Sequence, residues 1–380
     1  MKYFIIAGEP SGDLHGSNLI RGLKASDGEA EIICWGGELM EQAGGRLLMH
    51  YRRLAIMGLM AILLNIRTIA KNLTLCKKQL REFNPDVLIL IDFPSFNLRI
   101  ARFAKTLGIK VFYYISPKIW AWKESRIKKI KSDVDRMFII FPFEVDFYRK
   151  HNVEVEYYGN PLVDEIERKR LAFGDRNEMK KSLGLDDRPV IALLAGSRKH
   201  EVSHILPEMI RVVSYYPGYQ FVLACVKNLP EKLYSDIIGD LPVKMISDKT
   251  YEILWLSQAA LVTSGTATLE TALIGIPQVV CYKGDPVSFA IARRLVKVRF
   301  ISLVNLIMGK EVVTELIQFL LTEKNLVNEL NAIISAGAGR EKMLSEYENL
   351  RNKLGPAGAS SRIALEMIKS LKKVDINPDE

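Results

Sequence analysis

Apolar positions in the first 160 residues form short continuous runs, separated by longer stretches that have one apolar face. The run at residues 87–91 contains no polar position, which is typical of a parallel strand covered by helices on both sides of its sheet. Strands are predicted at residues 3–7, 31–35, 87–92, 110–116, 136–141 and 153–159, and helices between them at 11–24, 66–82 and 96–107. The pattern therefore predicts a doubly wound α/β domain.

The same alternation returns after a charged stretch at residues 164–188, which we interpret as the linker region. Strands are predicted at 189–195, 220–226, 243–247, 259–264 and 278–282, with helices at 201–213 and 266–274. From residue 311 onward the pattern is helical and ends in an amphipathic helix at 360–373. We predict an α/β fold of two Rossmann-like doubly wound domains, residues 1–165 and 166–350, that face each other across a cleft. A carboxyl-terminal helix, within 351–380, is expected to pack on the first domain or on a partner subunit.

Composition agrees with this organisation. With 380 residues, 48% hydrophobic and 26% charged, the chain suits two folded domains and is unlike collagen, a coiled coil or a disordered protein. Its four cysteines are far apart without a CxxC pair, which indicates a reducing cytoplasm. The amino terminus lacks the apolar length of a signal peptide. The longest apolar run, residues 54–64, is too short for a transmembrane helix, and it fits a core segment as well as an acyl-chain or membrane-facing surface.

One formal metal motif needs to be weighed. His200, Glu201 and His204 match the HExxH pattern of zinc proteases. No later histidine supplies a third ligand, and the motif follows directly after the small-residue turn at 196–198 instead of lying inside a long apolar helix. We therefore predict no metal site.

Ligands of open parallel sheets bind at the turns that follow the strands, so these turns are the first candidates for a site. The turn after the first strand contains Gly8, Glu9, Ser11, Gly12 and Asp13. Its glycines let the backbone approach a ligand, and Ser11 is predicted to cap the following helix. The turn is neither GxGxxG nor a P-loop, which disfavours NAD and ATP. A tight turn without a ligand is the alternative, although it would not need the acidic groups.

Asp92 ends a fully apolar strand and is followed by Pro94, which stops the strand. A carboxylate presented in this place is a candidate general base. The alternative is that Asp92 caps the helix that begins near Phe96.

Two turns of the second domain combine small residues with hydroxyl groups, at 196–198 (Gly-Ser-Arg) and 264–270 (Ser-Gly-Thr-Ala-Thr-Leu-Glu). Hydroxyls at a helix start opposite a guanidinium suit a diphosphate. The predicted donor-binding residues are Ser197, Arg198, Ser264, Gly265 and Thr266. Glu270 lies one turn into the helix and can accept hydrogen bonds from two ribose hydroxyls, or it is simply an exposed glutamate. The polar segments 302–306 and 311–318 either close over a nucleotide or cap helices.

These motifs resemble the family of lipid-A-disaccharide synthases, which are inverting glycosyltransferases with two Rossmann domains (GT-B). The resemblance runs nearly end to end and rests on AGEPSGDLHG, LAIMG, PDVLILID, YYISPKIWAW, FPFEVDFY, GSR, SGTATLE and the block from SLVNL to GKEVVTELIQ. It implies that 2,3-diacylglucosamine is transferred from UDP to the 6-hydroxyl of 2,3-diacylglucosamine 1-phosphate. The products would be a β-1,6-linked disaccharide and UDP, formed without a metal or other cofactor.

The resemblance also implies roles for single residues. Asp92 matches the family's base, Arg198 and the SGTATLE segment match the donor side, and Asn305 and Gln318 match further donor-side positions. Glu9, Ser11 and Gly12 match the first loop, on the acceptor side. The chain departs from the family pattern at Ala61, Ser95, Asn160, Ala195 and Val304. Because Ser95 stands where the family often has aspartate, more weight falls on Asp92 as the base.

The net charge of +9 suggests an anionic partner. Basic residues gather at 118–131, where Trp120 and Trp122 accompany them, and at 283–297. This composition favours a membrane surface, since tryptophan prefers the headgroup level. Nucleic acid is disfavoured because no RNA-binding signature is present. The resemblance implies a protein that is peripheral to the inner face of the cytoplasmic membrane and forms homodimers by exchanging carboxyl-terminal segments.

Three functions stay open on the sequence alone. The first is the lipid-directed glycosyltransferase. The second is another UDP-GlcNAc-using enzyme on the same fold, either a 2-epimerase or an undecaprenyl-linked N-acetylglucosaminyltransferase. The third is a catalytically silent membrane scaffold, which would tolerate replacement of Asp92.

Overall fold

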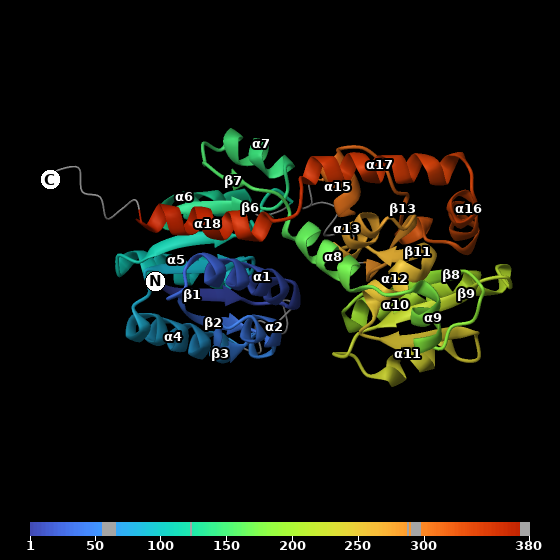
Figure 1. Ribbon diagram of the computed structural model, residues 1–380, viewed down its shortest axis with the longest axis horizontal. Helices are drawn as coiled ribbons and strands as arrows, with labels where there is room; N and C mark the ends of the chain where they lie inside the picture. Colours follow the sequence, from blue (N-terminus) through green and yellow to red (C-terminus); the bar gives the residue numbers. More distant parts are fainter. Residues whose placement is uncertain (55–65, 122–123, 287–288, 290–297, 373–380) are drawn as a thin grey trace. The chain divides into compact units, whose positions relative to one another are not determined.

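The computed structural model describes residues 1–54, 66–121, 124–286, 289 and 298–372 (Figure 1). Contacts divide the chain into two compact units. Unit 1 comprises Met1–Asp164 and Leu354–Glu380, and unit 2 comprises Glu165–Lys353. Each unit is an α/β structure built on its own parallel sheet, as the sequence predicts.

The sheet of unit 1 contains seven described strands, in the order β3-β2-β1-β4-β5-β6-β7. They are β1 (Lys2–Ala7), β2 (Glu31–Gly36), β3 (Arg46–His50), β4 (Val87–Ile91), β5 (Lys110–Tyr114), β6 (Arg136–Ile139) and β7 (Glu156–Tyr157). All pairings between these strands are parallel. The strand order reverses direction between β1 and β4, which makes this pair the topological switch point of the sheet.

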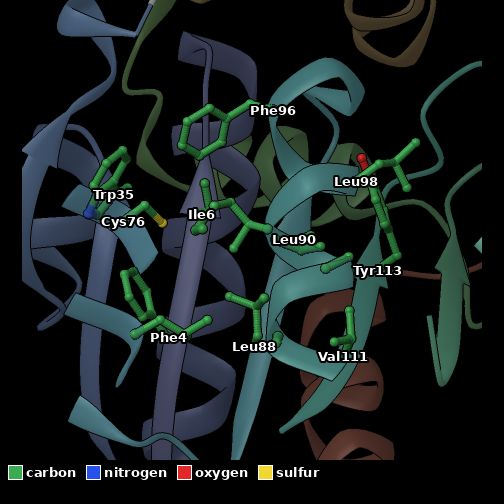
Figure 2. Close-up of a cluster of buried hydrophobic side chains, with 14 of the residues drawn as sticks. Phe4, Ile6, Trp35, Cys76, Leu88, Leu90, Phe96, Leu98, Val111 and Tyr113 are labelled. Atoms are coloured by element: carbon green, nitrogen blue, oxygen red, sulfur yellow. The ribbon is translucent and has the colours of Figure 1, made fainter. Parts of the chain in front are cut away.

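Helices cover the sheet of unit 1, whose central strands β1, β4 and β5 are almost entirely apolar and buried. The helices are α1 (Pro10–Ser26), α2 (Glu38–Gln42), α4 (Ile66–Phe83), α5 (Pro94–Thr106), α6 (Ile127–Asp133), α7 (Phe143–Lys150) and α18 (Ala359–Lys372). Figure 2 shows the core in which Cys76 of α4 and Phe96 of α5 meet strand residues such as Phe4 and Leu88. The carboxyl-terminal α18 packs against α1 of the same chain.

Unit 2 repeats this plan with six described strands, in the order β10-β9-β8-β11-β12-β13. They are β8 (Val190–Leu194), β9 (Gln220–Cys225), β10 (Val243–Ser247), β11 (Ser257–Thr263), β12 (Gln278–Tyr282) and β13 (Glu315–Ile317). The helices are α9 (Arg176–Ser182), α10 (Lys199–Met209), α11 (Glu231–Ile238), α12 (Thr250–Leu256), α13 (Thr266–Ile274), α15 (Leu303–Met308), α16 (Glu323–Ile334) and α17 (Ala338–Leu354), and α8 (Pro161–Ala172) leads into the unit. The switch point lies between β8 and β11.

The structure corrects three predictions about elements. Strand β3 was not predicted, and β13 interrupts the region after residue 311 that the pattern indicates to be purely helical. Both lie at sheet edges, where a strand pairs with a neighbouring strand on one side only and therefore needs few apolar residues. The charged stretch at 164–188 contains α8 and α9. Charged residues are good helix formers, so a high charge density does not distinguish a linker from a surface helix.

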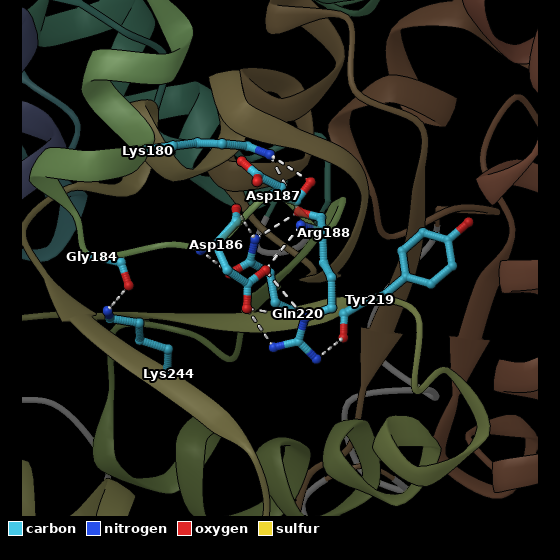
Figure 3. A network of polar contacts seen from close by, with 8 residues as sticks. All are labelled: Lys180, Gly184, Asp186, Asp187, Arg188, Tyr219, Gln220 and Lys244. Atoms are coloured by element: carbon cyan, nitrogen blue, oxygen red, sulfur yellow. Dashed lines mark hydrogen bonds and ion pairs between the residues drawn. The ribbon is translucent and has the colours of Figure 1, made fainter.

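A polar network ties together the amino-terminal ends of β8 and β9, on the side of the unit 2 sheet opposite its turns to helices (Figure 3). The side chain of Gln220, which is buried, donates from Nε2 to the carbonyl oxygens of Asp186 and Arg188 at 2.9 and 2.6 Å. Its Oε1 accepts from the Asp186 amide at 3.2 Å. The Arg188 guanidinium donates to the Asp186 carboxylate. These bonds satisfy the side-chain amide of Gln220, which would otherwise be buried unpaired at this edge.

Other expectations from composition can be compared with the structure. All four cysteines are buried thiols, and burial raises the pKa of Cys34 to about 12. They therefore pack as small hydrophobic side chains. Among the helices that the structure describes, none combines the length and the apolar character needed to cross a bilayer.

Candidate active site

The predicted site turns follow the strands that flank the two switch points. In unit 1 they are the turns after β1 and β4, and in unit 2 the turns after β8 and β11. Open parallel sheets bind ligands at this position because neighbouring turns leave the sheet in opposite directions there. Each unit therefore offers one candidate binding edge, which we describe separately.

The turn after β1 differs from the prediction in its helix cap. Helix α1 begins at Pro10 with Glu9 at the N-cap, and no side chain caps it, so the prediction that Ser11 is the cap is wrong. Pro10 fixes a helical φ one residue earlier than the serine requires. Gly12 lets α1 approach the sheet closely, since an added Cβ would lie 3.1 Å from the Cβ of Ala7. Glu9 and Ser11 remain at the amino-terminal end of α1.

Asp13 belongs to the fold and not to a ligand site. Its Oδ1 accepts from the amides of Gly37 and Met40 at 2.7 and 3.1 Å, and its Oδ2 accepts from the amide of Leu39 at 3.2 Å. The carboxylate thus satisfies the first amides of α2. Burial raises the pKa of Asp13, and these backbone hydrogen bonds oppose the rise.

The backbone at Asp92 is held in a left-handed conformation. Asp92 and Phe93 have φ values of +42° and +47°, which residues with a side chain adopt at a cost. The carbonyl oxygen of Asp92 accepts hydrogen bonds from the Tyr113 hydroxyl at 2.5 Å and from Asn97 Nδ2 at 2.8 Å. The amide of Asp92 donates to the carbonyl of Ile115 at 3.3 Å. Neighbouring elements therefore fix the direction in which the Asp92 carboxylate leaves the sheet.

The Asp92 side chain faces a cation. Its Oδ2 lies 3.6 Å from Nζ of Lys118, and the carboxylate is about a quarter exposed. The alternative in which Asp92 caps the next helix is wrong, since α5 begins at Pro94 with Phe93 at the N-cap and no side-chain cap. The carboxylate is instead available at the switch point, where it can accept a proton.

Phe93 connects the two turns of unit 1. Its ring covers Gly8 so closely that a Cβ on Gly8 would lie 2.3 Å from Phe93 Cγ. The ring also stacks on Phe96 at a centroid distance of 5.6 Å. Gly8 is therefore required where it stands, because it leaves room for the residue that follows Asp92.

In unit 2, Glu201 organises the turn after β8. Its Oε2 accepts from the amides of Ser197 and Arg198 at 3.0 and 3.2 Å, and its Oε1 lies 3.3 Å from Nη1 of Arg198. Gly196, with φ of +110°, leaves room for this carboxylate. His204 Nδ1 bonds to the carbonyl of His200 at 2.7 Å. The HExxH residues thus serve the turn and its helix, and among the described residues no cluster of three potential metal ligands occurs.

The turn after β11 begins α13 with an open amino-terminal end. Gly265 has φ of +156°, and nothing within 4 Å would meet a Cβ there. The Ser264 hydroxyl donates to the carbonyl of Ile301 at 2.8 Å, and Thr266 is the first residue of the helix. Backbone amides at such an end attract anions. One turn later, Glu270 Oε1 accepts from the Tyr251 hydroxyl at 2.7 Å, and burial raises the Glu270 pKa.

Asn305 and Gln318 use their amide groups within unit 2. Asn305 accepts from the amides of Val312 and Val313 and donates to Glu315 Oε1 at 2.9 Å. Gln318, with φ of +53°, exchanges two hydrogen bonds with the backbone of Gly284 at 3.2 and 3.1 Å. These contacts hold together the segments of unit 2 that follow β12. Direct contact of either side chain with a donor stays a prediction.

Sequence reasoning missed the residues that hold these groups in place. Asn97 and Tyr113 fix the backbone at Asp92, Lys118 pairs with its carboxylate, and Glu315 accepts from the amides of Ile301 and Ser302. Lys118 was noted only as part of a basic stretch. The signal available was its place directly after β5, the strand next to β4.

Several predicted features have other roles or fall outside the description. Asn160 caps α8 by accepting from the amide of Leu162 at 2.9 Å, and Ser95 accepts from Arg126 Nη2 at 3.0 Å. The Trp120 indole donates to the buried Glu144 carboxylate at 3.0 Å, and a place for Trp120 at the headgroup level of a membrane stays a prediction. Residues 55–64, with Ala61, Trp122 and most of 283–297, lie outside the described residues.

Comparison with protein families gives a match over nearly the whole chain. The family model described as lipid-A-disaccharide synthetase matches residues 3–367. Curated relatives named lipid-A-disaccharide synthase include that of Trichlorobacter lovleyi, 38% identical over 96% of each chain. That of Syntrophus aciditrophicus is 39% identical over 98% of each chain.

Solved structures share the fold at low identity. UDP-GlcNAc 2-epimerase from Neisseria meningitidis, bound to UDP-GlcNAc, gives a TM-score of 0.70 at 13% identity, covering 97% of this chain and 100% of that chain. The calicheamicin glycosyltransferase CalG4 gives a TM-score of 0.62 at 14% identity, covering 98% and 99%. At these identities the likeness establishes the two-domain fold and nothing about the reaction.

Proposed function

Since the chain belongs to the lipid-A-disaccharide synthase family, we propose that Asp92 is the general base with which it makes the lipid A disaccharide. The reaction joins a UDP-sugar donor to a sugar-lipid acceptor. The observation that carries the proposal is the Asp92 carboxylate itself, fixed at the switch point of unit 1 by bonds to its own backbone.

In this mechanism Asp92 acts on the acceptor. One carboxylate oxygen of Asp92 accepts the proton of the 6-hydroxyl of 2,3-diacylglucosamine 1-phosphate. At the same time the oxygen of this 6-hydroxyl forms a bond to the anomeric carbon of the donor. The bond from that carbon to the UDP oxygen breaks on the opposite side, which inverts the configuration. Lys118, 3.6 Å from Asp92 Oδ2, pairs with this carboxylate on the side of the loop after β5.

Unit 2 is proposed to hold the donor. The amides at the start of α13 and the guanidinium of Arg198 would neutralise the diphosphate and, as the bond breaks, the negative charge of leaving UDP. Ser197, Ser264, Gly265 and Thr266 line the same two turns. Glu270 would accept hydrogen bonds from the ribose hydroxyls after Tyr251 turns its own hydroxyl away. Asn305 and Gln318 would act by holding the segments beside the donor.

The lipid acceptor also suggests where the protein works. We propose that it attaches peripherally to the inner face of the cytoplasmic membrane, with exposed Lys128, Lys129 and Lys131 of α6 toward anionic headgroups. Each such lysine adds about 1 kcal/mol near an anionic surface. Flotation with vesicles with and without anionic lipid tests this. The predicted homodimer remains to be tested by its mass in solution.

The test of the base uses UDP-2,3-diacylglucosamine and the 1-phosphate acceptor, with product detected by mass spectrometry. Asp92→Asn keeps the size and the backbone bonds but cannot accept the proton, so kcat should fall about 10³-fold. UDP affinity, measured by calorimetry, should stay unchanged. Arg198→Ala should instead act on donor binding and weaken the affinity for UDP about 10- to 100-fold.

Asp146→Asn is the matched control, since Asp146 is an exposed carboxylate of unit 1. Unchanged turnover in Asp92→Asn would contradict the base assignment. Wild-type protein that binds UDP but converts UDP-GlcNAc to its 2-epimer, without disaccharide, would instead favour the epimerase alternative.

A further inference from the structure

A buried carboxylate of unit 1, Glu144, lies outside the residues already assigned. It is the second residue of α7 and is 1% exposed. Its Oε2 accepts from the amide of Phe141 at 3.1 Å, which closes the start of the helix. A helix end needs no more than this, yet the other oxygen of the carboxylate is also bonded.

That second oxygen reaches the loop after β5. Glu144 Oε1 accepts from the indole Nε1 of Trp120 at 3.0 Å, and the Trp120 ring packs edge-on against Phe143 at 4.9 Å. The Ser116 hydroxyl also hydrogen-bonds the carboxylate, and it lies 2.6 Å from the Tyr148 hydroxyl. One buried side chain thus holds the loop at two points, four residues apart.

Lys118 lies between these two points. It has φ of +49°, and Ile115 at the start of the loop has φ of +68°. The loop is therefore held in a conformation that its own residues disfavour, and hydrogen bonds from outside must compensate for the strain. Ile115 also accepts from the amide of Asp92, so the same loop contacts the proposed base through its backbone and through its lysine.

We propose that Glu144 is a positioning residue for the transfer: its carboxylate clamps Ser116 and Trp120 so that Lys118 stays opposite Asp92. This rests on the proposed function, since it takes Asp92 as the base. Glu144 touches neither substrate nor Asp92, and it acts through the loop.

The protonation of Glu144 should affect the clamp. Burial raises its pKa to about 7. The groups that face it from the loop after β5 and from the residues before α7 are hydrogen-bond donors, namely Ser116, Trp120 and the amides of Ile140 and Phe141. The nearby tyrosines are Tyr148 of α7 and Tyr157 of β7. Burial raises the pKa of both tyrosines so far that they stay neutral here. A carboxylate accepts from all these donors, whereas a protonated carboxyl must give up one acceptor position.

Glu144→Gln tests this by making the neutral form permanent at nearly constant volume. At pH 8.5 we expect kcat to fall about 10- to 100-fold, since small misplacements near a reacting group have effects of that size. The ratio of wild-type to variant kcat/KM should shrink toward one below pH 6, where the wild type itself is protonated. Trp120→Phe keeps the packing on Phe143 and loses the hydrogen bond to Glu144, so kcat should fall about tenfold.

Two further measurements separate positioning from damage to the fold. In the Asp92→Asn background, Glu144→Gln should cause no additional loss of kcat, and UDP affinity should equal that of the wild type in every variant. Asp146→Asn, on the same helix but exposed, serves again as the control. Full activity of Glu144→Gln at pH 8.5, an additive loss in the double variant, or a pH-independent ratio would each overturn the inference. Full activity of Asp92→Asn would overturn the proposed base, which is a separate result.

Discussion

The two units place their turns at equivalent switch points but build them from different residues. At the carboxyl edge of unit 1, residues with side chains take left-handed conformations, namely Asp92, Phe93, Ile115 and Lys118. At the equivalent edge of unit 2, glycines take the unusual conformations after β8 and β11, at Gly196 and Gly265. At the turns beside the two switch points, the same topology is thus strained in unit 1 and relaxed in unit 2, although Asp248 after β10 and Gln318 after β13 also take positive φ in unit 2.

This difference matches the two tasks proposed for the units. A diphosphate needs accessible backbone amides, and glycine gives that access without strain. A general base needs one carboxylate in one orientation, which here requires bonds from Asn97 and Tyr113 to outweigh an unfavourable backbone. Strain at the edge of unit 1 is therefore expected to make its geometry easier to disturb than that of unit 2.

After Asp92→Asn, the largest expected effect on turnover comes from Gly8→Ala. The new Cβ would lie 2.3 Å from the Phe93 ring, which must move and take the adjacent Asp92 backbone with it. We expect kcat to fall about 100-fold, because displacement of a catalytic group by about 1 Å has this cost. UDP affinity, which we propose to depend on unit 2, should not change. Steady-state kinetics and calorimetry measure the two quantities.

Gly28→Ala is the matched control, since no atom lies within 4 Å of the added Cβ and the position is in the same unit. It should leave kcat at the wild-type value. If Gly8→Ala also kept its activity, the strained edge of unit 1 would not be what positions Asp92.

The sequence reveals more of the relaxed edge than of the strained one. Gly265 and the hydroxyls in SGTATLE predict an anion-binding turn within seven adjacent residues, because the glycine itself provides the conformation. Asp92 could also be found, since a carboxylate after a fully apolar strand is a local signal. Tyr113 could not, because it contacts Asp92 only through the pairing of β5 with β4. Asn97 is five residues from Asp92, but its contact depends on the left-handed turn that leads into α5.

A similar limit applies to the fold. Strands buried on both faces, such as β4, are recognised from their continuous apolar pattern. Edge strands such as β13 have three residues, and the pairing with β12 that defines them is not visible along the chain. Likewise, the sequence predicts Ser11 as a helix cap, whereas in the structure the helix already begins at Pro10.

A second way to contrast the units is acid stability, where His15→Gln is informative. His15 of α1 is buried, and burial, followed by the charge of Lys118, lowers its pKa to about 4. The unfolded chain binds a proton near pH 6.5, so the stability present above that pH is lost as pH falls toward 4. At pH 5 this linkage costs the wild type about 2 kcal/mol of unfolding free energy.

The variant lacks this loss, so its stability should depend less on pH between 6.5 and 4. Urea unfolding at several pH values, followed by signals specific to each unit, measures it. His204→Gln in unit 2 is the control, since it makes the same substitution at an exposed histidine. Glu144 has a linkage of opposite sign, because its raised pKa favours the folded state below pH 7. Equal pH dependence of wild type and His15→Gln would show that His15 is not neutral in the folded protein.

The smallest effect is expected at the amino edge of unit 2, where Gln220→Ala removes the centre of the network in Figure 3. The carbonyls of Asp186 and Arg188 lose a donor but lie near the surface, so water replaces part of what they lose. Unfolding free energy should fall by about 1 kcal/mol. UDP affinity should not change, because the proposed donor turns leave the opposite end of the same strands.

Lys244→Ala, which removes an exposed member of the network bonded to Gly184, should cost less than about 0.5 kcal/mol. A weaker affinity for UDP in Gln220→Ala without loss of stability would mean that the two edges of this sheet are coupled, and that the relaxed edge of unit 2 depends on its amino end.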